Sequence, residues 1–189
     1  MTIPDSVTRI GERAFQDCIS LTNVTIPNSI TIIEDYAFSG CRSLKEFKGK
    51  FAVDGGRCLI IYGVLHAFAI GCGVTQYTIP DSVTTIYDYV FSHCNSLTSV
   101  TIGNRVKTIG YAAFSDCSSL TSVTIPRSVT YIGDRAFEDC TSLETIICKP
   151  TIPPKLKDMA FVGIPSNTTI IIPEGCENDY KKSDWKKVL

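Results

Sequence analysis

Short stretches of alternating apolar and polar residues recur along the chain, and each is rich in β-branched residues. In the stretch Leu97-Thr98-Ser99-Val100-Thr101-Ile102, the side chains of Leu97, Val100 and Ile102 are predicted to point inward. This pattern is typical of a half-buried β-strand. A proline follows the strand and ends it, because proline has no amide hydrogen to donate to a sheet. The prolines in this position are Pro4, Pro27, Pro80 and Pro126.

A second short extended segment follows each proline, as in Val83-Thr84-Thr85-Ile86, and its two apolar ends are expected to point inward. The motif Ala-Phe-x-x-Cys-x-Ser-Leu comes next. Here the segment from Gly110 to Phe114, and its equivalents, are predicted to make a turn or a single helical turn that closes the unit. The phenylalanine fills the interior, where its burial contributes about 1.5–3 kcal/mol.

The motif returns at a fixed interval. Phe15 and Phe38 are 23 residues apart, and so are Phe91, Phe114 and Phe137 in succession. A period of about 20–29 residues with Leu and Ile at set positions is the signature of a leucine-rich-repeat solenoid. We therefore predict a right-handed solenoid of the β/α type with short strands and short helical turns. Its phenylalanine and cysteine side chains should line up in continuous inner columns.

The regular repeats are interrupted once. Full copies cover residues 3–25, 26–48, 79–101, 102–124 and 125–147. Residues 49–78 break the pattern, and Asp54-Gly55-Gly56-Arg57 is a strong hairpin-turn signal between two apolar stretches. We predict a β-hairpin insert there, part of a small β-meander that either stacks into the solenoid or leans out of it.

The last part of the chain departs from the repeat. Residues 148–170 read as a degenerate sixth copy, which would complete a solenoid domain over 1–170. Residues 171–189 are predicted to form a C-terminal cap, with Tyr180 and Trp185 folded over the last unit. The first repeat begins at once, without a cap for its exposed apolar end. The chain is therefore expected to be a fragment of a longer protein.

The nine cysteines are an odd number, so they cannot all form pairs. Stacked units are about 4.8 Å apart, and parallel side chains at that spacing keep their Cβ atoms farther apart than the roughly 3.5–4.5 Å of a disulfide. We expect reduced, buried thiols at the repeated position, in Cys18, Cys41, Cys94, Cys117 and Cys140. The sequence leaves open whether a pair forms among Cys58, Cys72, Cys148 and Cys176.

Composition excludes some partners. The net charge is −1, with 20% charged and 44% hydrophobic residues. A nearly neutral chain without a clustered basic surface gives no electrostatic basis for binding nucleic acid. No stretch reaches the roughly 18 apolar residues of a membrane span, so no membrane insertion is expected.

The consensus Ile-Pro-x-Ser-Val-Thr-x-Ile-Gly-x-x-Ala-Phe-x-x-Cys-x-Ser-Leu resembles the 23-residue repeat of the BspA-like (Treponema pallidum-type) leucine-rich-repeat family. The insert around residues 50–60 is similar to hairpin inserts of bacterial members, and residues 148–154 and 172–181 are similar to their terminal module. The resemblance covers essentially the whole chain. It implies an extracellular or cell-surface solenoid of host-associated bacteria, in a family linked to adhesion to host proteins or to other cells.

Candidate chemistry is sparse. The two histidines, His66 and His93, lie in different segments. His93 precedes Cys94, but a nucleophilic pair would also need an orienting group and a pocket. His93 is instead expected to be a solvent-facing turn residue, since other copies have Asp or Gly there. The sequence holds no Cys-x-x-Cys metal motif and no phosphate-binding loop. We therefore expect neither an enzyme nor a cofactor or metal site.

Two sets of residues are candidates for binding a partner. The first is the outward face of the repeated strands, which is the usual binding surface of a solenoid, although its hydroxyl residues also suit a plain soluble sheet. Its candidate residues are Asn23, Thr25, Glu46, Lys48, Ser99, Thr101, Ser122, Thr124 and Thr145. The second set consists of tyrosines, which are favoured at recognition surfaces but would also be ordinary fillers of a repeat unit. They are Tyr36, Tyr87, Tyr89, Tyr111 and Tyr131.

The leading hypothesis is a non-enzymatic module of an extracellular or surface-anchored protein. It would bind a host or bacterial surface protein through the strand face or the insert. A glycan-binding module is the alternative suggested by the hydroxyl residues and tyrosines. A structural spacer without a ligand of its own is the third.

Overall fold

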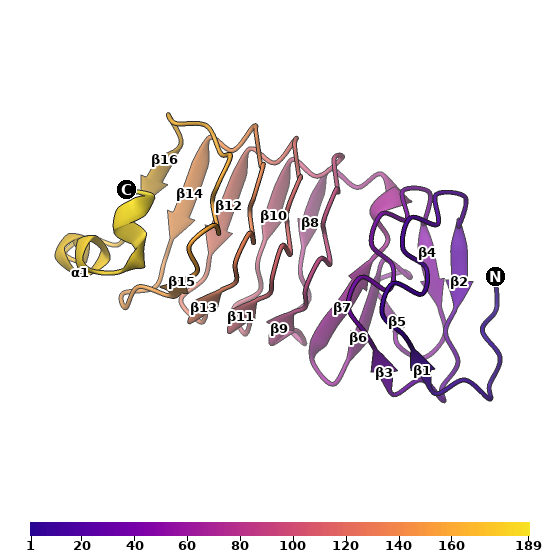
Figure 1. Ribbon diagram of the computed structural model, residues 1–189. Helices are drawn as coiled ribbons and strands as arrows, with labels where there is room; N and C mark the ends of the chain where they lie inside the picture. Colours follow the sequence, from indigo (N-terminus) through magenta and orange to yellow (C-terminus); the bar gives the residue numbers. More distant parts are fainter.

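The computed structural model describes all residues 1–189 and shows a solenoid of short parallel strands ending in a small helical cap (Figure 1). Each rung contributes two strands. The first strands of the rungs are β2 (Asn23–Thr25), β4 (Glu46–Lys48), β8 (Gln76–Thr78), β10 (Ser99–Thr101), β12 (Ser122–Ile125), β14 (Thr145–Cys148) and β16 (Thr169–Ile171). The second strands are β1 (Arg9–Ile10), β3 (Ile32–Ile33), β9 (Thr85–Ile86), β11 (Thr108–Ile109), β13 (Tyr131–Ile132) and β15 (Lys155–Leu156).

The strands stack in register at the repeat period. Val100 lies beside Val123 and Ile109 beside Ile132, each pair 23 residues apart. The first strands β8 to β16 form one five-stranded sheet, and the second strands β9 to β15 belong to a seven-stranded sheet. The first two rungs form separate sheets, β2 with β4 and β1 with β3. The predicted solenoid is therefore confirmed, but its sheets are divided.

The interior of the later rungs is a stack of phenylalanine rings. The ring centroids of Phe91 and Phe114 are 4.8 Å apart and those of Phe114 and Phe137 are 5.1 Å apart, with nearly parallel planes. The thiols form a second column, because Cys117 donates its Sγ hydrogen to the carbonyl of Phe91 and Cys140 donates to that of Phe114. These two cysteines thus each bond a carbonyl of the preceding rung, and all nine cysteines of the chain are free.

The expectation of continuous inner columns is wrong at the insert. Phe38 does not stack on Phe91; it packs edge-on against Phe47, with ring centroids 5.2 Å apart. The ring next to Phe91 is that of Phe68, at 4.7 Å. The buried residues accordingly form two clusters, a smaller one in the first two rungs and a larger one in the remaining rungs. We call residues 1–48 the N-terminal block and residues 64–189 the C-terminal stack.

The insert separates these two parts. β5 (Ala52–Val53), β6 (Cys58–Ile61) and β7 (Val64–Phe68) form an antiparallel meander that joins the seven-stranded sheet through β9. Leu59 and Ala67 pack on the N-terminal block, whereas Cys58 and Phe68 pack on the C-terminal stack. We call β6 and β7 the dividing hairpin. Strands buried on both faces are continuously apolar, which explains the unbroken run of β6.

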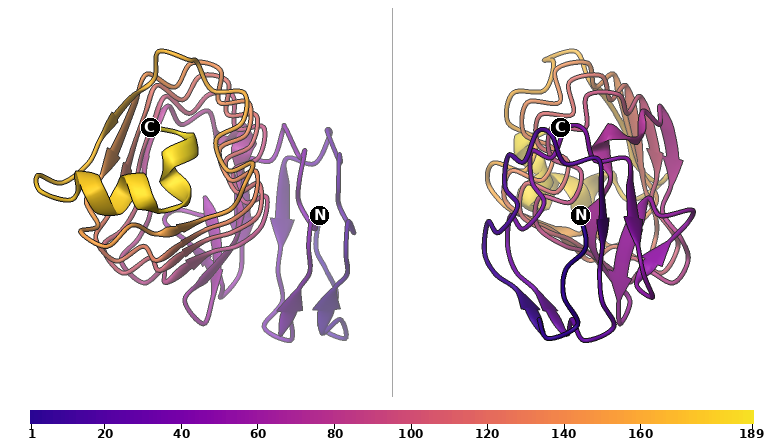
Figure 2. Two further views of the ribbon diagram at one scale, coloured as in Figure 1. Left: turned by 60° about the vertical axis from the view of Figure 1, so that its left-hand side comes forward. Right: turned by 90° about the vertical axis from the view of Figure 1, so that its right-hand side faces the viewer.

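Part of the insert is itself a rung. Ala67-Phe68 lies 23 residues before Val90-Phe91, and Tyr77 of β8 pairs with Val100 at the same interval. A short 3₁₀ turn, Ile70–Cys72, links the dividing hairpin to β8. The extra residues of the insert therefore lie before β7. In Figure 2, the N-terminal strands are set to one side of the coil that the C-terminal stack forms.

The C-terminal end is closed by α1 (Glu177–Lys182) and a 3₁₀ turn, Asp184–Lys187. Trp185 is fully buried against Phe161, with ring centroids 5.6 Å apart, and its indole Nε1 donates to the carbonyl of Pro154 at 2.9 Å. The hydroxyl of Tyr180 donates to the carbonyl of Pro150, also at 2.9 Å. The prolines that disturb the sixth copy thus leave carbonyl groups that hold the cap.

Candidate binding site

The segments that close each rung are turns with two residues in the left-handed region of backbone conformation. The second of these positions directly precedes the column cysteine. It is occupied by Asp17, Gly40, His93, Asp116 and Asp139, all with positive φ. Asp, His and Gly tolerate this conformation better than other residues. The positive φ of this position therefore accounts for the residue types found there. His93 lies in such a turn, with 39% of its side chain exposed.

The first left-handed position directly precedes the Ala-Phe pair or its equivalent. It is occupied by Arg13, Tyr36, Tyr89, Ala112 and Arg135, with φ between 47° and 59°. This conformation is uncommon for Arg and Tyr, and a non-glycine residue in it costs on the order of 1–3 kcal/mol. The stacked backbone imposes it: the amide of Tyr89 donates to the carbonyl of Tyr111 at 3.0 Å, and that of Ala112 to Asp134 at 3.0 Å.

Long side chains from these turns form a line along one face of the solenoid. The Arg13 guanidinium lies 4.8 Å from the centre of the Tyr36 ring. Ring centroids are 3.8 Å apart for Tyr36 and Tyr89, and 5.2 Å apart for Tyr89 and Tyr111. Arg135 lines the same concavity as Tyr111. We call Arg13, Tyr36, Tyr89, Tyr111 and Arg135 the turn-face row.

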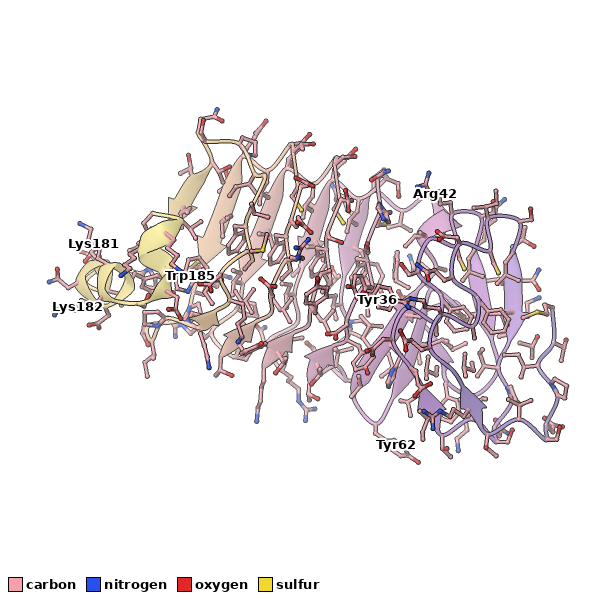
Figure 3. All side chains as sticks on the ribbon, viewed as in Figure 1. Tyr36, Arg42, Tyr62, Lys181, Lys182 and Trp185 are labelled. Carbon is pink, nitrogen blue, oxygen red and sulfur yellow. The ribbon has the colours of Figure 1, made fainter.

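The turn-face row crosses the division between the two parts of the molecule. Tyr36 belongs to the N-terminal block and lies at its boundary with the C-terminal stack (Figure 3). Its hydroxyl is hydrogen-bonded to that of Tyr89, although 53 residues separate the two in sequence. Burial, followed by the bonds to Tyr36 and Tyr111, raises the pKa of Tyr89 well above its usual range. The phenol of Tyr89 therefore remains neutral and acts as a hydrogen-bonding group.

A concavity of about 220 Å³ lies along this row. Arg135 bonds both carboxylate oxygens of Glu138, at 3.0 and 3.3 Å, and this neighbouring carboxylate raises the pKa of the arginine. Asp116 lies 3.7 Å from the Nδ1 of His93 and keeps 44% of its side chain exposed. The residues around the concavity are Gln16, Tyr36, Ser39, Tyr89, Ser92, His93, Tyr111, Ala112, Ser115, Asp116, Arg135 and Glu138.

The predicted strand-face residues fall on two different sheets. Ser99, Ser122 and Thr145 are direct neighbours in the five-stranded sheet. Thr101 and Thr124 form a second ladder beside them. The remaining predicted residues lie in the N-terminal block, where Asn23 pairs with Glu46 and Thr25 with Lys48. The structure therefore does not bring all of these residues onto one continuous sheet.

The predicted tyrosines also separate into groups. Tyr36, Tyr89 and Tyr111 come together in the turn-face row. Tyr87 packs instead against His66, with ring centroids 5.0 Å apart, and burial raises its pKa to about 12. Tyr131 lies in β13, between Thr108 of β11 and Lys155 of β15.

Sequence reasoning missed the charged members of the site. Arg13 and Arg135 occupy the same repeat position as Tyr36 and Tyr89, one residue before the Ala-Phe pair or its equivalent. Comparing the copies at that position would have grouped these residues. Asp116 and Glu138 could not be found in this way, since their proximity depends on how successive turns stack.

His66 is the only histidine of the dividing hairpin, and its side chain is half-buried. Its Nδ1 is buried without a hydrogen-bond partner, and burial lowers its pKa to about 4. Glu34 and Asp88 line the same small space, and burial raises the pKa of Asp88. No group of three or more His, Cys, Asp or Glu side chains is placed to hold a metal ion.

Comparison with known proteins agrees with this architecture. The pattern described as the BspA type leucine rich repeat region matches residues 1–52 and 65–182, in six copies. The chain belongs to this family. The match resumes at the start of β7, which supports assigning the second half of the insert to a rung. No curated protein matches the chain.

Solved structures of leucine-rich proteins are also similar to this chain. A leucine-rich cell surface protein of Faecalibacterium prausnitzii is 27% identical, with a TM-score of 0.69 over 94% of this chain and 54% of that protein. The leucine-rich repeat protein of T. pallidum is 27% identical, with a TM-score of 0.53 over 92% and 69% of the respective chains. This chain thus spans about half the length of the Faecalibacterium protein.

None of the helices in this BspA-type chain has the length and apolar character needed to cross a membrane.

Proposed function

We propose that the chain is a non-enzymatic recognition module of an extracellular or cell-surface protein, and that it binds another protein through the turn-face row. The observation that carries this proposal is the line of arginine and contacting tyrosine side chains that crosses the two parts of the solenoid. The description of the Faecalibacterium relative as a cell surface protein supports the proposed location.

The composition of the row suits protein recognition. Tyrosine and arginine dominate the residues that carry binding energy in protein interfaces. The row is also well ordered, because Tyr36 and Tyr89 stand at left-handed turn positions and the ring of Tyr89 contacts those of both Tyr36 and Tyr111. A rigid surface loses less conformational entropy on binding than a flexible one. The strand face offers mainly short hydroxyl side chains and has no aromatic residue among those predicted.

A glycan is the second candidate ligand. The hydroxyls of Tyr36 and Tyr89 are bonded to each other beside the carboxylate of Asp116, so the concavity offers several donors and acceptors. These groups could hydrogen-bond the hydroxyls of a sugar. The extended row, which continues over several rungs, favours a protein.

A binding screen tests the proposal. The chain would be applied to immobilised matrix and cell-surface proteins and to a glycan array, together with a Tyr36→Ala/Tyr89→Ala variant. A Thr101→Ala/Thr124→Ala variant of the strand face is the matched control. We expect a protein ligand whose binding weakens roughly 30-fold in the tyrosine variant, the effect of losing about 2 kcal/mol, and is unchanged in the control. Loss of binding only in the control would move the site to the strand face. Absence of any ligand would favour a spacer.

A further inference from the structure

One rung lacks a long side chain at the first left-handed position. Four rungs place arginine or tyrosine at the first left-handed position, in Arg13, Tyr36, Tyr89 and Arg135. The rung between Tyr89 and Arg135 has Ala112 there, with the same left-handed backbone. Its tyrosine, Tyr111, stands one residue earlier, where the other rungs carry an acidic residue.

The concavity lies at this rung. Ala112 is one of its lining residues, with Tyr89 on the preceding rung and Arg135 on the following one. Its volume of about 220 Å³ is below the roughly 300–1,000 Å³ of a site for a drug-sized ligand. A space of this size suits a single long side chain. The rung has Ala112 at the first left-handed position, where the other four rungs place such a side chain.

The charges around the concavity favour a cation. Arg135 is already paired with Glu138 through two hydrogen bonds. Asp116 has only the His93 Nδ1 nearby, at 3.7 Å, which is longer than a hydrogen bond. The carboxylate of Asp116 is thus the charge without a close partner. The other lining groups carry no charge: they are three serines, the phenols of three tyrosines, Gln16 and Ala112.

The row itself shows which cation fits. The guanidinium of Arg13 lies over the ring of Tyr36 at 4.8 Å from its centre. Arginine combines a planar group that stacks on aromatic rings with several donors for a carboxylate, whereas lysine presents a compact and strongly hydrated charge. An arginine entering beside Tyr111 would repeat an arrangement that the row already contains.

We propose that the concavity at Ala112 receives an arginine side chain from the partner protein. This inference rests on the proposed function, and it adds the chemical identity of the group that the partner inserts. The guanidinium lies against the tyrosine rings and donates hydrogen bonds to Asp116. It lies beside Tyr111, between the rungs of Tyr89 and Arg135.

A peptide titration followed by NMR tests the proposal. The probe is acetyl-Gly-Arg-Gly-amide, and the matched control is the same peptide with citrulline, which keeps the shape of arginine but has no charge. We expect the arginine peptide to shift the amide signals of Tyr111, Ala112 and Asp116, and the citrulline peptide to bind several-fold more weakly. Asp116→Asn should weaken the arginine peptide about two- to fivefold, as for an exposed ion pair.

The variant Ala112→Arg provides the decisive comparison. Arg13 and Arg135 already occupy the equivalent backbone conformation, so the main chain can carry an arginine here that fills the concavity from within. Because Ala112 is buried, the amide signals of the neighbouring rungs are used to check that the variant keeps its fold. The substitution should abolish the shifts caused by the arginine peptide, whereas Ala112→Gly should retain them. Equal binding of both peptides, binding by Ala112→Arg, or preferential binding of a neutral sugar at these residues would overturn the inference.

The two proposals can fail separately. A protein partner that requires Tyr89 but binds Ala112→Arg normally would leave the proposed function intact and contradict the arginine site. Peptide binding that Ala112→Arg abolishes, without any protein ligand in the screen, would support the site and contradict the proposed function.

Discussion

The N-terminal block and the C-terminal stack are built from the same repeat but differ in how completely their interiors are buried. The buried cluster that includes the block has 15 residues, four of which come from the insert, whereas the cluster of the stack has 34. Phe114 is fully buried between two parallel rings, while Phe15 has one ring neighbour and is only partly buried. Identical motifs therefore contribute differently to stability, because a rung gains burial only from the neighbours stacked on it.

The largest expected effect compares the same substitution in the two parts. Phe114→Ala should lower the free energy of unfolding by about 3–5 kcal/mol, since it leaves a cavity between two rings. Phe15→Ala should lower the free energy of unfolding by clearly less, because the side chain of Phe15 is already partly exposed. Urea denaturation of both variants measures the difference. If both variants lost the same free energy of unfolding, the difference in burial between Phe114 and Phe15 would not determine their contributions to stability.

The dividing hairpin offers a way to weaken one part alone. Leu59 is fully buried and packs on the N-terminal block. Leu59→Ala should destabilise the block by about 2–5 kcal/mol and increase hydrogen exchange in β2 and β4 more than in β12 and β14. A uniform increase over all four strands would show that the two parts unfold as one unit.

The same hairpin is expected to make stability depend on pH. His66 has a pKa near 6.5 in the unfolded chain and about 4 in the folded one, because burial disfavours its charged form. The contribution of neutral His66 to the free energy of unfolding is therefore complete above pH 6.5. It decreases as the pH falls toward 4 and changes no further below that. The total loss is about 3 kcal/mol, from the size of the shift.

Chemical denaturation of the protein between pH 7 and pH 4 measures this loss. His66→Gln, which cannot be protonated in this range, provides the comparison and should show a smaller decrease. Glu34 and Asp88, which line the same space, remain in both proteins, so their titration cancels in the difference. An identical pH profile for the two proteins would rule out His66 as the cause.

Much of this architecture is visible in the sequence. The interval between Phe91, Phe114 and Phe137 predicts the stacked rungs, and the placement of Trp185 over the last rung follows from the end of the repeat. The division into two parts is harder to predict. It depends on β6 and β7 being buried on both faces, and the only sign in the sequence is Ala67-Phe68 at the repeat interval before Val90-Phe91.

The candidate site is predictable only in part. The tyrosines were identifiable as a group, but the sequence gives no reason to separate Tyr87 and Tyr131 from Tyr36, Tyr89 and Tyr111. That separation depends on where each tyrosine lies relative to the left-handed position: Tyr36 and Tyr89 occupy it and Tyr111 directly precedes it, whereas Tyr87 and Tyr131 lie earlier in their rungs. The concavity depends on a small residue, Ala112, between larger neighbours, and it can be recognised only once the stacking of the turns is known.

The left-handed positions have a consequence for how such a molecule diversifies. Because hydrogen bonds between neighbouring turns fix the main chain there, Arg, Tyr and Ala are all accommodated without altering the coil. Duplication or exchange of single 23-residue modules would then change the side chains on this surface while the backbone of the solenoid stays the same. New specificity could arise by shuffling whole units, with no need to redesign the scaffold.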